Sequence, residues 1–190
     1  MQIQTVGIIG AGTMGNGIAQ ACATSGINVV MVDISEAAVQ KGLATVAGSL
    51  DRLIKKEKIS AADKEAALAK IKVSTDYSAL KAAQLVIEAA TENEALKVKI
   101  LQEVDALVGP EVLIASNTSS ISITKLAAVT GRADKFIGMH FFNPVPMMAL
   151  VEVIRGLQTS DATHAAVQAL AQQLGKTPST VKNGPGFVVN

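Results

Sequence analysis

Gly10-Ala11-Gly12-Thr13-Met14-Gly15 is the stretch of sequence that decides the fold. It directly follows the apolar run Val6–Ile9, which is typical of a buried strand, and it opens a helical pattern at 13–25. In a loop of this form the first glycine permits a tight turn, the second lets the backbone approach a pyrophosphate, and the third lets helix and strand pack closely. The N–H groups at the start of the helix then attract phosphates, which predicts a dinucleotide-binding loop.

Asp33 is the second part of the expected cofactor site. It follows an apolar run at 28–32 and lies 18 residues after Gly15. An acidic side chain at this place accepts hydrogen bonds from the adenosine ribose hydroxyls. Because no arginine follows Asp33 to hold a 2′-phosphate, the sequence predicts NAD rather than NADP. The alternative is that Asp33 caps a turn and the glycines only pack, but the context of a strand before and a helix after favours the cofactor.

Composition excludes several classes of protein. The chain has 190 residues, 49% of them apolar, and 17 Lys+Arg balance 16 Asp+Glu to a net charge of +1. A nucleic-acid binder needs a clear cationic excess, and a disordered chain is less apolar. The single cysteine, Cys22, rules out an internal disulfide and fits a reducing compartment. No run approaches the roughly 18 apolar residues of a membrane span. We therefore expect a cytoplasmic globular domain without nucleic-acid or membrane partners.

Short apolar runs alternate with longer stretches that favour helix. Repeated strand–helix units need crossovers, and these favour a parallel sheet with helices on both faces. The sequence thus predicts an α/β fold, a Rossmann-type doubly wound and mostly parallel sheet. The expected strands are Val6–Ile9, Val29–Val32, Val86–Ile87 with its flanks, Val112–Ala115, Phe136–Met139 and Leu150–Ile154, and the expected helices are 13–25, 35–58, 60–70, 93–107, 122–129 and 161–174.

Two helix starts and one boundary are also expected. Ser60 with Asp63 resembles a capping box, and Asp161 is expected to cap the last helix. Asn183-Gly184-Pro185-Gly186 has the composition of a domain boundary. We therefore assign 1–183 to the NAD-binding domain and 184–190 to a hinge.

Polar side chains follow the later strands, where the chemistry of such a fold is placed. The segment Ser116-Asn117-Thr118-Ser119-Ser120 follows one strand, His140 ends another, and Glu152 lies within an apolar run. A buried glutamate needs a partner, and a histidine within reach would provide it. Such a pair suits dehydrogenation of an alcohol, because the imidazole removes the hydroxyl proton while hydride leaves. From spacing alone, His140 and Glu152 can equally be unrelated residues.

Six segments resemble the L-3-hydroxyacyl-CoA dehydrogenases, and the resemblance is strongest to the bacterial 3-hydroxybutyryl-CoA dehydrogenases. It covers essentially the whole chain, and the histidine-containing and serine-rich segments are more specific than the glycine loop. The segments are GAGTMG at 10–15, AATEN at 89–93, SNTSSISIT at 116–124, GMHFFNPVP at 138–146, LVEVI at 150–154 and NGPGFVVN at 183–190.

The resemblance implies a reaction and a set of site residues. The reaction is reversible, NAD-dependent oxidation of an (S)-3-hydroxyacyl-CoA to the 3-ketoacyl-CoA, with 3-hydroxybutyryl-CoA as the expected substrate. His140 is the acid/base and Glu152 orients it, while Ser119 and Asn190 position the substrate. No metal is expected. The implied NAD contacts beyond the glycine loop and Asp33 are Glu92, Lys97, Asn117 and Asn143.

The resemblance also implies a CoA site and a further domain. Ser49 and Lys56, on the helix after the second strand, match residues that contact CoA in the family, although the end of a solvated helix has the same composition. The family carries a helical C-terminal domain that pairs two subunits, so a homodimer is expected of the whole protein. For the 190-residue chain alone we expect NAD binding with weak turnover.

Two other functions stay open at this point. A different β-hydroxyacid dehydrogenase on a similar fold commonly uses a lysine on a later helix, and the His140–Glu152 pair argues against it. An isolated NAD-binding module with little or no catalysis is the second alternative.

Overall fold

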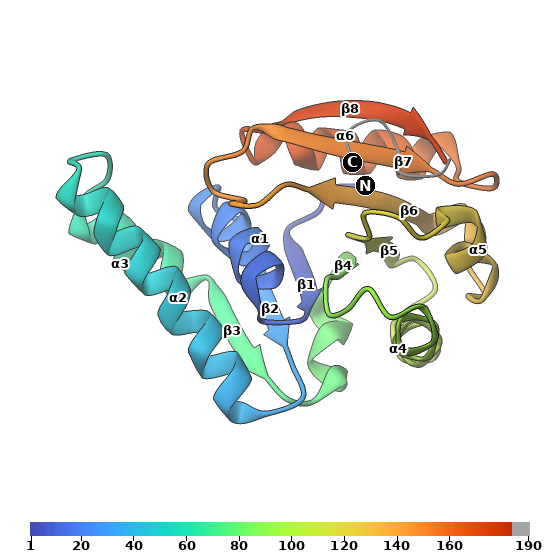
Figure 1. The fold of residues 1–190 in the computed structure, drawn as a ribbon, viewed down its shortest axis with the longest axis horizontal. Helices are drawn as coiled ribbons and strands as arrows, with labels where there is room; N and C mark the ends of the chain where they lie inside the picture. The colour runs from blue at the N-terminus through green and yellow to red at the C-terminus, as the bar shows by residue number, and fades with distance from the viewer. Residues whose placement is uncertain (184–190) are drawn as a thin grey trace.

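The structure is a computed structural model, and it describes residues 1–183 (Figure 1). The expected hinge at 184–190, with Asn190, lies outside the described residues. The strands are β1 (Thr5–Ile9), β2 (Asn28–Val32), β3 (Ile71–Ser74), β4 (Leu85–Glu88), β5 (Leu113–Ser116), β6 (Phe136–Phe141), β7 (Leu150–Arg155) and β8 (Thr177–Lys182). The α-helices are α1 (Thr13–Thr24), α2 (Glu36–Lys55), α3 (Ala61–Ala69), α4 (Glu94–Leu107), α5 (Ile123–Ala128) and α6 (Asp161–Gln173), with short 3-10 turns at Tyr77–Ala82 and Ala133–Lys135.

The strands form one eight-stranded sheet in the order β3-β2-β1-β4-β5-β6-β7-β8. Every neighbouring pair is parallel except β6 and β7, which are antiparallel. This arrangement confirms the prediction of a Rossmann-type, doubly wound and mostly parallel sheet. The six strands expected from the sequence are all present, and β3 and β8 were missed.

Helices cover both faces of the sheet. Because successive side chains of a strand point to opposite faces, each strand can contribute apolar side chains to a core on either face. In β1, Val6 and Ile8 pack in one apolar core with α1, α2, α3 and α6, whereas Ile9 packs in a second core with α4 and α5. Figure 1 shows the α2–α3 pair beyond the β3 edge and α6 against β7 and β8. None of the described helices is long and apolar enough to cross a membrane.

The helix starts explain one feature of the glycine loop. The capping box of Ser60 and Asp63 is confirmed at the start of α3. The prediction for α6 is wrong by one residue, since the Ser160 side chain accepts the capping hydrogen bond and Asp161 is the first helical residue. Among the described α-helices, α1 alone has no side-chain cap, because its N-cap is Gly12. The first N–H groups of α1 therefore need acceptors from elsewhere.

Candidate active site and cofactor cavity

The glycine loop between β1 and α1 meets two separate steric demands, at Gly10 and at Gly15. Gly10 has φ +107°, a conformation that L side chains rarely adopt. A Cβ on Gly15 would lie 1.7 Å from the carbonyl oxygen of Gly10, so only glycine lets α1 pack this close to β1. A Cβ on Gly12 would instead meet nothing within 4 Å. Gly12 therefore leaves its backbone open toward a ligand at the uncapped start of α1.

A first cavity of about 360 Å³ lies in front of this loop. Its wall includes Asp33, whose Oδ2 accepts a hydrogen bond from the backbone N–H of Ala11 at 2.8 Å. The acid after β2 thus also fixes the loop after β1. Of the residues expected to hold NAD, this cavity brings together Gly10, Gly12, Thr13, Met14, Asp33, Glu92, Lys97 and Asn117.

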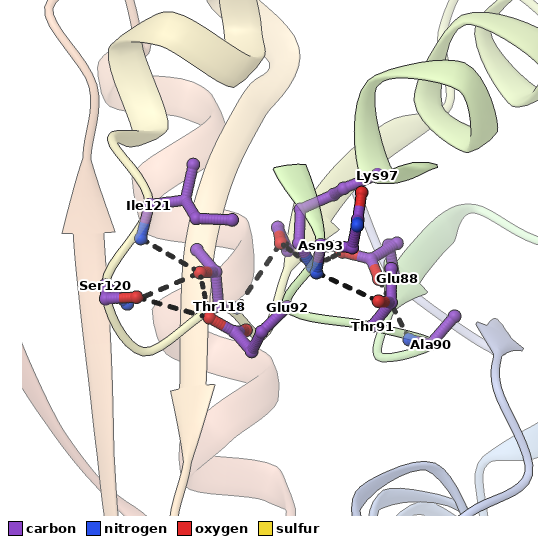
Figure 2. Close-up of polar contacts among 10 residues, drawn as sticks. Glu88, Ala90, Thr91, Glu92, Asn93, Lys97, Thr118, Ser120 and Ile121 are labelled. Atoms are coloured by element: carbon purple, nitrogen blue, oxygen red, sulfur yellow. Dashed lines mark hydrogen bonds and ion pairs between the residues drawn. The ribbon is translucent and has the colours of Figure 1, made fainter. Parts of the chain in front are cut away.

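The opposite wall of the first cavity is tied together by Glu92 and Thr118. Glu92 lies in the β4–α4 loop, and its Oε2 accepts hydrogen bonds from the hydroxyls of Thr118 (3.0 Å) and Ser120 (3.3 Å). The completely buried Thr118 hydroxyl oxygen also accepts from the backbone N–H groups of Ser120 and Ile121. These contacts, drawn in Figure 2, join the loop after β4 to the loop after β5. Thr118 was not singled out by the sequence analysis, although it lies within the serine-rich segment.

A buried ionic cluster lies beside this wall. Lys97, on α4, pairs with Glu88 at the end of β4 (Figure 2). Glu88 also accepts hydrogen bonds from the Ser116 hydroxyl at 2.9 Å and from the Ala90 backbone N–H at 2.8 Å. The sequence analysis expected Lys97 at the cofactor but missed Glu88. An acidic residue that ends the apolar run Leu85–Ile87 is the signal that could have found it.

His140 and Glu152 are brought together by β6 and β7, which form the one antiparallel pair among the strands of residues 1–183. They are directly opposite each other in the β6–β7 register, and Nδ1 of His140 lies 3.1 Å from Oε1 of Glu152. His140 is 6% exposed and Glu152 is fully buried. The carboxylate therefore fixes the orientation of the imidazole ring. Strand alternation places both on the α4–α5 face of the sheet, which Glu88 and Ser116 share.

A second cavity, of about 510 Å³, adjoins His140. It shares Met14, Glu92 and Asn117 with the first cavity, so the two are continuous at these residues. Asn117 is held in place because its Oδ1 accepts a hydrogen bond from the Phe141 backbone N–H at 2.8 Å. Phe142 packs its ring against His140, with the ring centroids 4.4 Å apart. The remaining lining residues are Ser119, Phe141 and Asn143.

A third cavity, of about 710 Å³, separates the C-terminal half of α2 from the loop at 143–147. Ser49 and Lys56 both line it, together with the cationic Arg52 and Lys58. Lys176 fastens the loop by donating hydrogen bonds to the carbonyls of Val145 (2.6 Å) and Met148 (2.8 Å). Most of the expected site residues within 1–183 therefore line one of three neighbouring cavities. Ala11, Gly15 and Glu152 do not, and Glu152 contacts His140 instead. Asn190 lies outside the described residues.

Cys22 has no part in these cavities. Its side chain, on α1, is buried in the apolar core between α1 and the sheet, and burial raises the pKa of its thiol to about 12. A thiol that stays protonated is a packing residue rather than a nucleophile.

The comparisons with known proteins decide the family. Residues 5–184 match the family model described as 3-hydroxyacyl-CoA dehydrogenase, NAD binding domain. The chain belongs to this family. NAD is therefore its cofactor, and the open Cβ position at Gly12, the uncapped start of α1 and the carboxylate of Asp33 fit a dinucleotide.

Three relatives illustrate the similarity. The chain is 46% identical over 188 residues to the 3-hydroxybutyryl-CoA dehydrogenase of Bradyrhizobium diazoefficiens, covering 99% of this chain and 64% of the relative. It is 47% identical to a probable 3-hydroxybutyryl-CoA dehydrogenase of Deinococcus radiodurans, covering 97% and 66%. The crystal structure of the (S)-3-hydroxybutyryl-CoA dehydrogenase of Ralstonia eutropha is 77% identical, with a TM-score of 0.99, over 100% of this chain and 67% of that chain. The chain thus spans about two thirds of the length of these relatives.

Proposed function

We propose that this domain, within a protein of its relatives' length, carries out the reversible NAD-dependent oxidation of (S)-3-hydroxyacyl-CoA to 3-ketoacyl-CoA. The names of the relatives point to 3-hydroxybutyryl-CoA as the substrate. The observation that carries the proposal is the buried His140–Glu152 pair at the wall of a cavity that continues into the cofactor cavity.

His140 is the proton acceptor in this proposal. Since Nδ1 faces Glu152, proton transfer from the substrate hydroxyl falls to Nε2 on the opposite side of the ring. Glu152 holds the ring in one orientation and compensates the positive charge that the imidazole gains. In the reverse direction the same nitrogen returns the proton to the ketone oxygen.

The cofactor and the remaining residues complete the proposal. Bound NAD supplies the hydride acceptor. The glycine loop and Asp33 hold its adenosine and pyrophosphate end, while Glu92, Lys97, Asn117 and Asn143 contact it from the facing loops. Ser119 lines the second cavity beside His140, where its hydroxyl can bind the substrate oxygen. Asn190 is assigned the same task by the family resemblance alone.

The CoA moiety is assigned to the third cavity. Ser49 contributes a hydroxyl there, and Lys56 contributes one of three cationic side chains with Arg52 and Lys58. Cations at this wall attract the CoA phosphates, although the net charge of the whole chain is only +1. The cavity shares Thr13 with the first cavity and Asn143 with the second. A CoA thioester lying in it would therefore have its acyl end near His140.

The test combines NAD titration with an acetoacetyl-CoA reduction assay, on this chain and on one extended beyond Asn190. We expect both chains to bind NAD and the extended chain to turn over acetoacetyl-CoA faster. Free β-hydroxy acids serve as the control substrate. Faster turnover of a free hydroxy acid than of the CoA thioester would contradict the proposed substrate.

The same experiment addresses the other functions. NAD binding by the extended chain without turnover of any substrate would favour a module with little or no catalysis. Subunit pairing is proposed for the longer protein only, and sedimentation of both chains measures it directly.

A further inference from the structure

Glu88 is a buried carboxylate to which the proposed reaction gives no task. Its side chain ends β4 and is 0% exposed. One oxygen accepts hydrogen bonds from Lys97 Nζ and the Ser116 hydroxyl, and the other accepts from the Ala90 backbone N–H. A single carboxylate thus joins α4, the end of β5 and the loop after β4 (Figure 2). Among residues 1–183, no buried side-chain nitrogen or oxygen lacks a hydrogen-bond partner, so each buried polar side-chain atom of this network has at least one.

Two of the groups that Glu88 holds belong to the wall of the first cavity. Lys97 is only 1% exposed, yet both Lys97 and Ala90 line that cavity. A buried ammonium without a counter-charge is strongly unfavourable, and Glu88 supplies that counter-charge. An ammonium carries three N–H donors, and contacts to Glu88 and Ser116 account for two of them. The geometry leaves Lys97 charged, immobilised and at the cavity surface.

We infer that Glu88 is a positioning residue for cofactor binding, which fixes the Lys97 ammonium in the wall that NAD contacts. A wall that is already ordered loses little conformational freedom when a ligand binds. The inference rests on the proposed function in one respect, since it assumes that Lys97 touches NAD. Glu88 itself touches no ligand and acts through Lys97.

A second ion pair, between a buried arginine and a half-buried aspartate, provides a control for effects on folding alone. Arg132 is 7% exposed, and its Nε donates to Asp105 Oδ1 at 2.6 Å. Its other donors bind backbone carbonyls, including those of Gly109 and Val112, just before β5 begins. This is the end of the sheet opposite to Glu88. Asp105→Asn should therefore destabilise the domain without changing NAD affinity.

The experiment measures the NADH dissociation constant by fluorescence, and the melting temperature, for four variants of the domain, with Asp33→Ala as a reference for a weakened cofactor site. Glu88→Gln keeps the shape but removes the charge, and Lys97→Met keeps the stem of the side chain but removes the ammonium. The double variant and Asp105→Asn complete the set. We expect Glu88→Gln and Lys97→Met each to raise the dissociation constant by about tenfold or more. The double variant should bind no more weakly than the weaker single variant, because the two residues act as one unit. Asp105→Asn should lower only the melting temperature.

Three results would overturn the inference. The first is an unchanged dissociation constant in Glu88→Gln. The second is a double variant whose loss equals the product of the two single losses. The third is an unchanged NADH dissociation constant in Lys97→Met while Asp33→Ala weakens NADH binding. That result would support the location of the NAD site but would contradict the role of Glu88. Failure of the parent domain to bind NADH would instead contradict the proposed function.

If Glu88→Gln does not fold, the test uses the double variant, in which both charges are removed. The inference then requires the double variant to have the same NADH dissociation constant as Lys97→Met, with both binding NADH more weakly than the parent domain. A further loss beyond Lys97→Met would show that Glu88 acts independently of Lys97, and would reject the inference.

Discussion

Two ion pairs, each with a buried cation, lie at opposite ends of the same sheet, and they differ in what their donors face. At the amino end of β5, Arg132 binds Asp105 and also donates to the carbonyls of Asp105, Val108, Gly109 and Val112. At the carboxyl end of β4, Lys97 binds Glu88 and Ser116 and forms part of a cavity wall. The Arg132–Asp105 pair satisfies carbonyls at the carboxyl end of α4, whereas the Lys97–Glu88 pair holds a charged group at a cavity that a ligand can enter.

The difference teaches that burial of a charge does not by itself mark a functional residue. Lys97 and Arg132 are both buried and hydrogen-bonded, so the exposure of the cation alone does not separate the two pairs. The direction of the donors separates the two pairs. The guanidinium of Arg132 donates mostly to backbone carbonyls, whereas Lys97 lines a cavity. His140 lies near the carboxyl end of β6, and Glu152 lies opposite it near the amino end of the antiparallel β7, so the polar groups of the site share one end and one face of the sheet. We therefore expect changes at this end of the sheet to alter ligand binding and turnover rate, and changes at the opposite end to alter stability.

The largest effect is expected at the His140–Glu152 pair. His140→Gln or Glu152→Gln, in a chain of the relatives' length, should reduce turnover of acetoacetyl-CoA by about 10²–10⁴-fold, because proton transfer is lost. NAD affinity should remain nearly unchanged, since neither side chain lines the first cavity. Steady-state kinetics and NADH titration of the same preparations measure both quantities. Equal losses in rate and NAD affinity would mean that the pair supports the cofactor site instead.

The next effect is expected at the opposite end of the sheet. Arg132→Met removes the guanidinium donors of Asp105 Oδ1 and of several backbone carbonyls, so it should lower the free energy of unfolding by about 3–5 kcal/mol. Urea denaturation of the domain measures the loss. NADH affinity of the folded fraction should stay within about twofold of the parent, a difference below 0.5 kcal/mol. A larger loss of affinity would break the distinction between the two ends.

The smallest effect is expected at Thr118, whose hydroxyl contributes to stability and also supports a loop of the site. Thr118→Val keeps the volume but removes the hydroxyl that joins Glu92 to the backbone of Ser120 and Ile121. We expect a loss of about 1 kcal/mol in stability, because the part-buried N–H groups of Ser120 and Ile121 lose their acceptor. Because the same loop carries Ser119, KM for acetoacetyl-CoA should rise as well. Thr118→Ser, which retains the hydroxyl, is the control, and a loss of stability without any change in KM would assign Thr118 to the scaffold alone.

The sequence predicted the sheet except for its edges. β3 and β8 are the two outermost strands, and neither forms the continuous apolar run on which the prediction depended. In β8 only Val181 is buried, and the strand contains a proline, which edge strands tolerate. The cap of α6 was misplaced because Ser160 and Asp161 are both good N-cap residues, and only the backbone conformation separates them.

The site was predicted where residue type and position carry the signal. Glu152 was found because it interrupts an apolar strand, and Glu88 was missed although it ends one in the same way. The contacts of Arg132 have no counterpart in the sequence, because most of its partners are backbone carbonyls that every residue possesses. Thr118 was passed over for a similar reason, since half of its hydrogen bonds come from backbone N–H groups.

The reversal of β7 has a consequence for chain connectivity. A parallel strand after β6 would need a crossover of a dozen or more residues, whereas the antiparallel β7 follows a short loop. His140 and Glu152 are therefore 12 residues apart, while the contacts that join the walls of the cofactor cavity span 22 to 28 residues. Closing the shorter loop costs about 0.7 kcal/mol less chain entropy than closing the longest of them. The part of the site that handles the proton depends on the register of one hairpin, whereas the part that holds the cofactor depends on the order of β2, β1, β4 and β5.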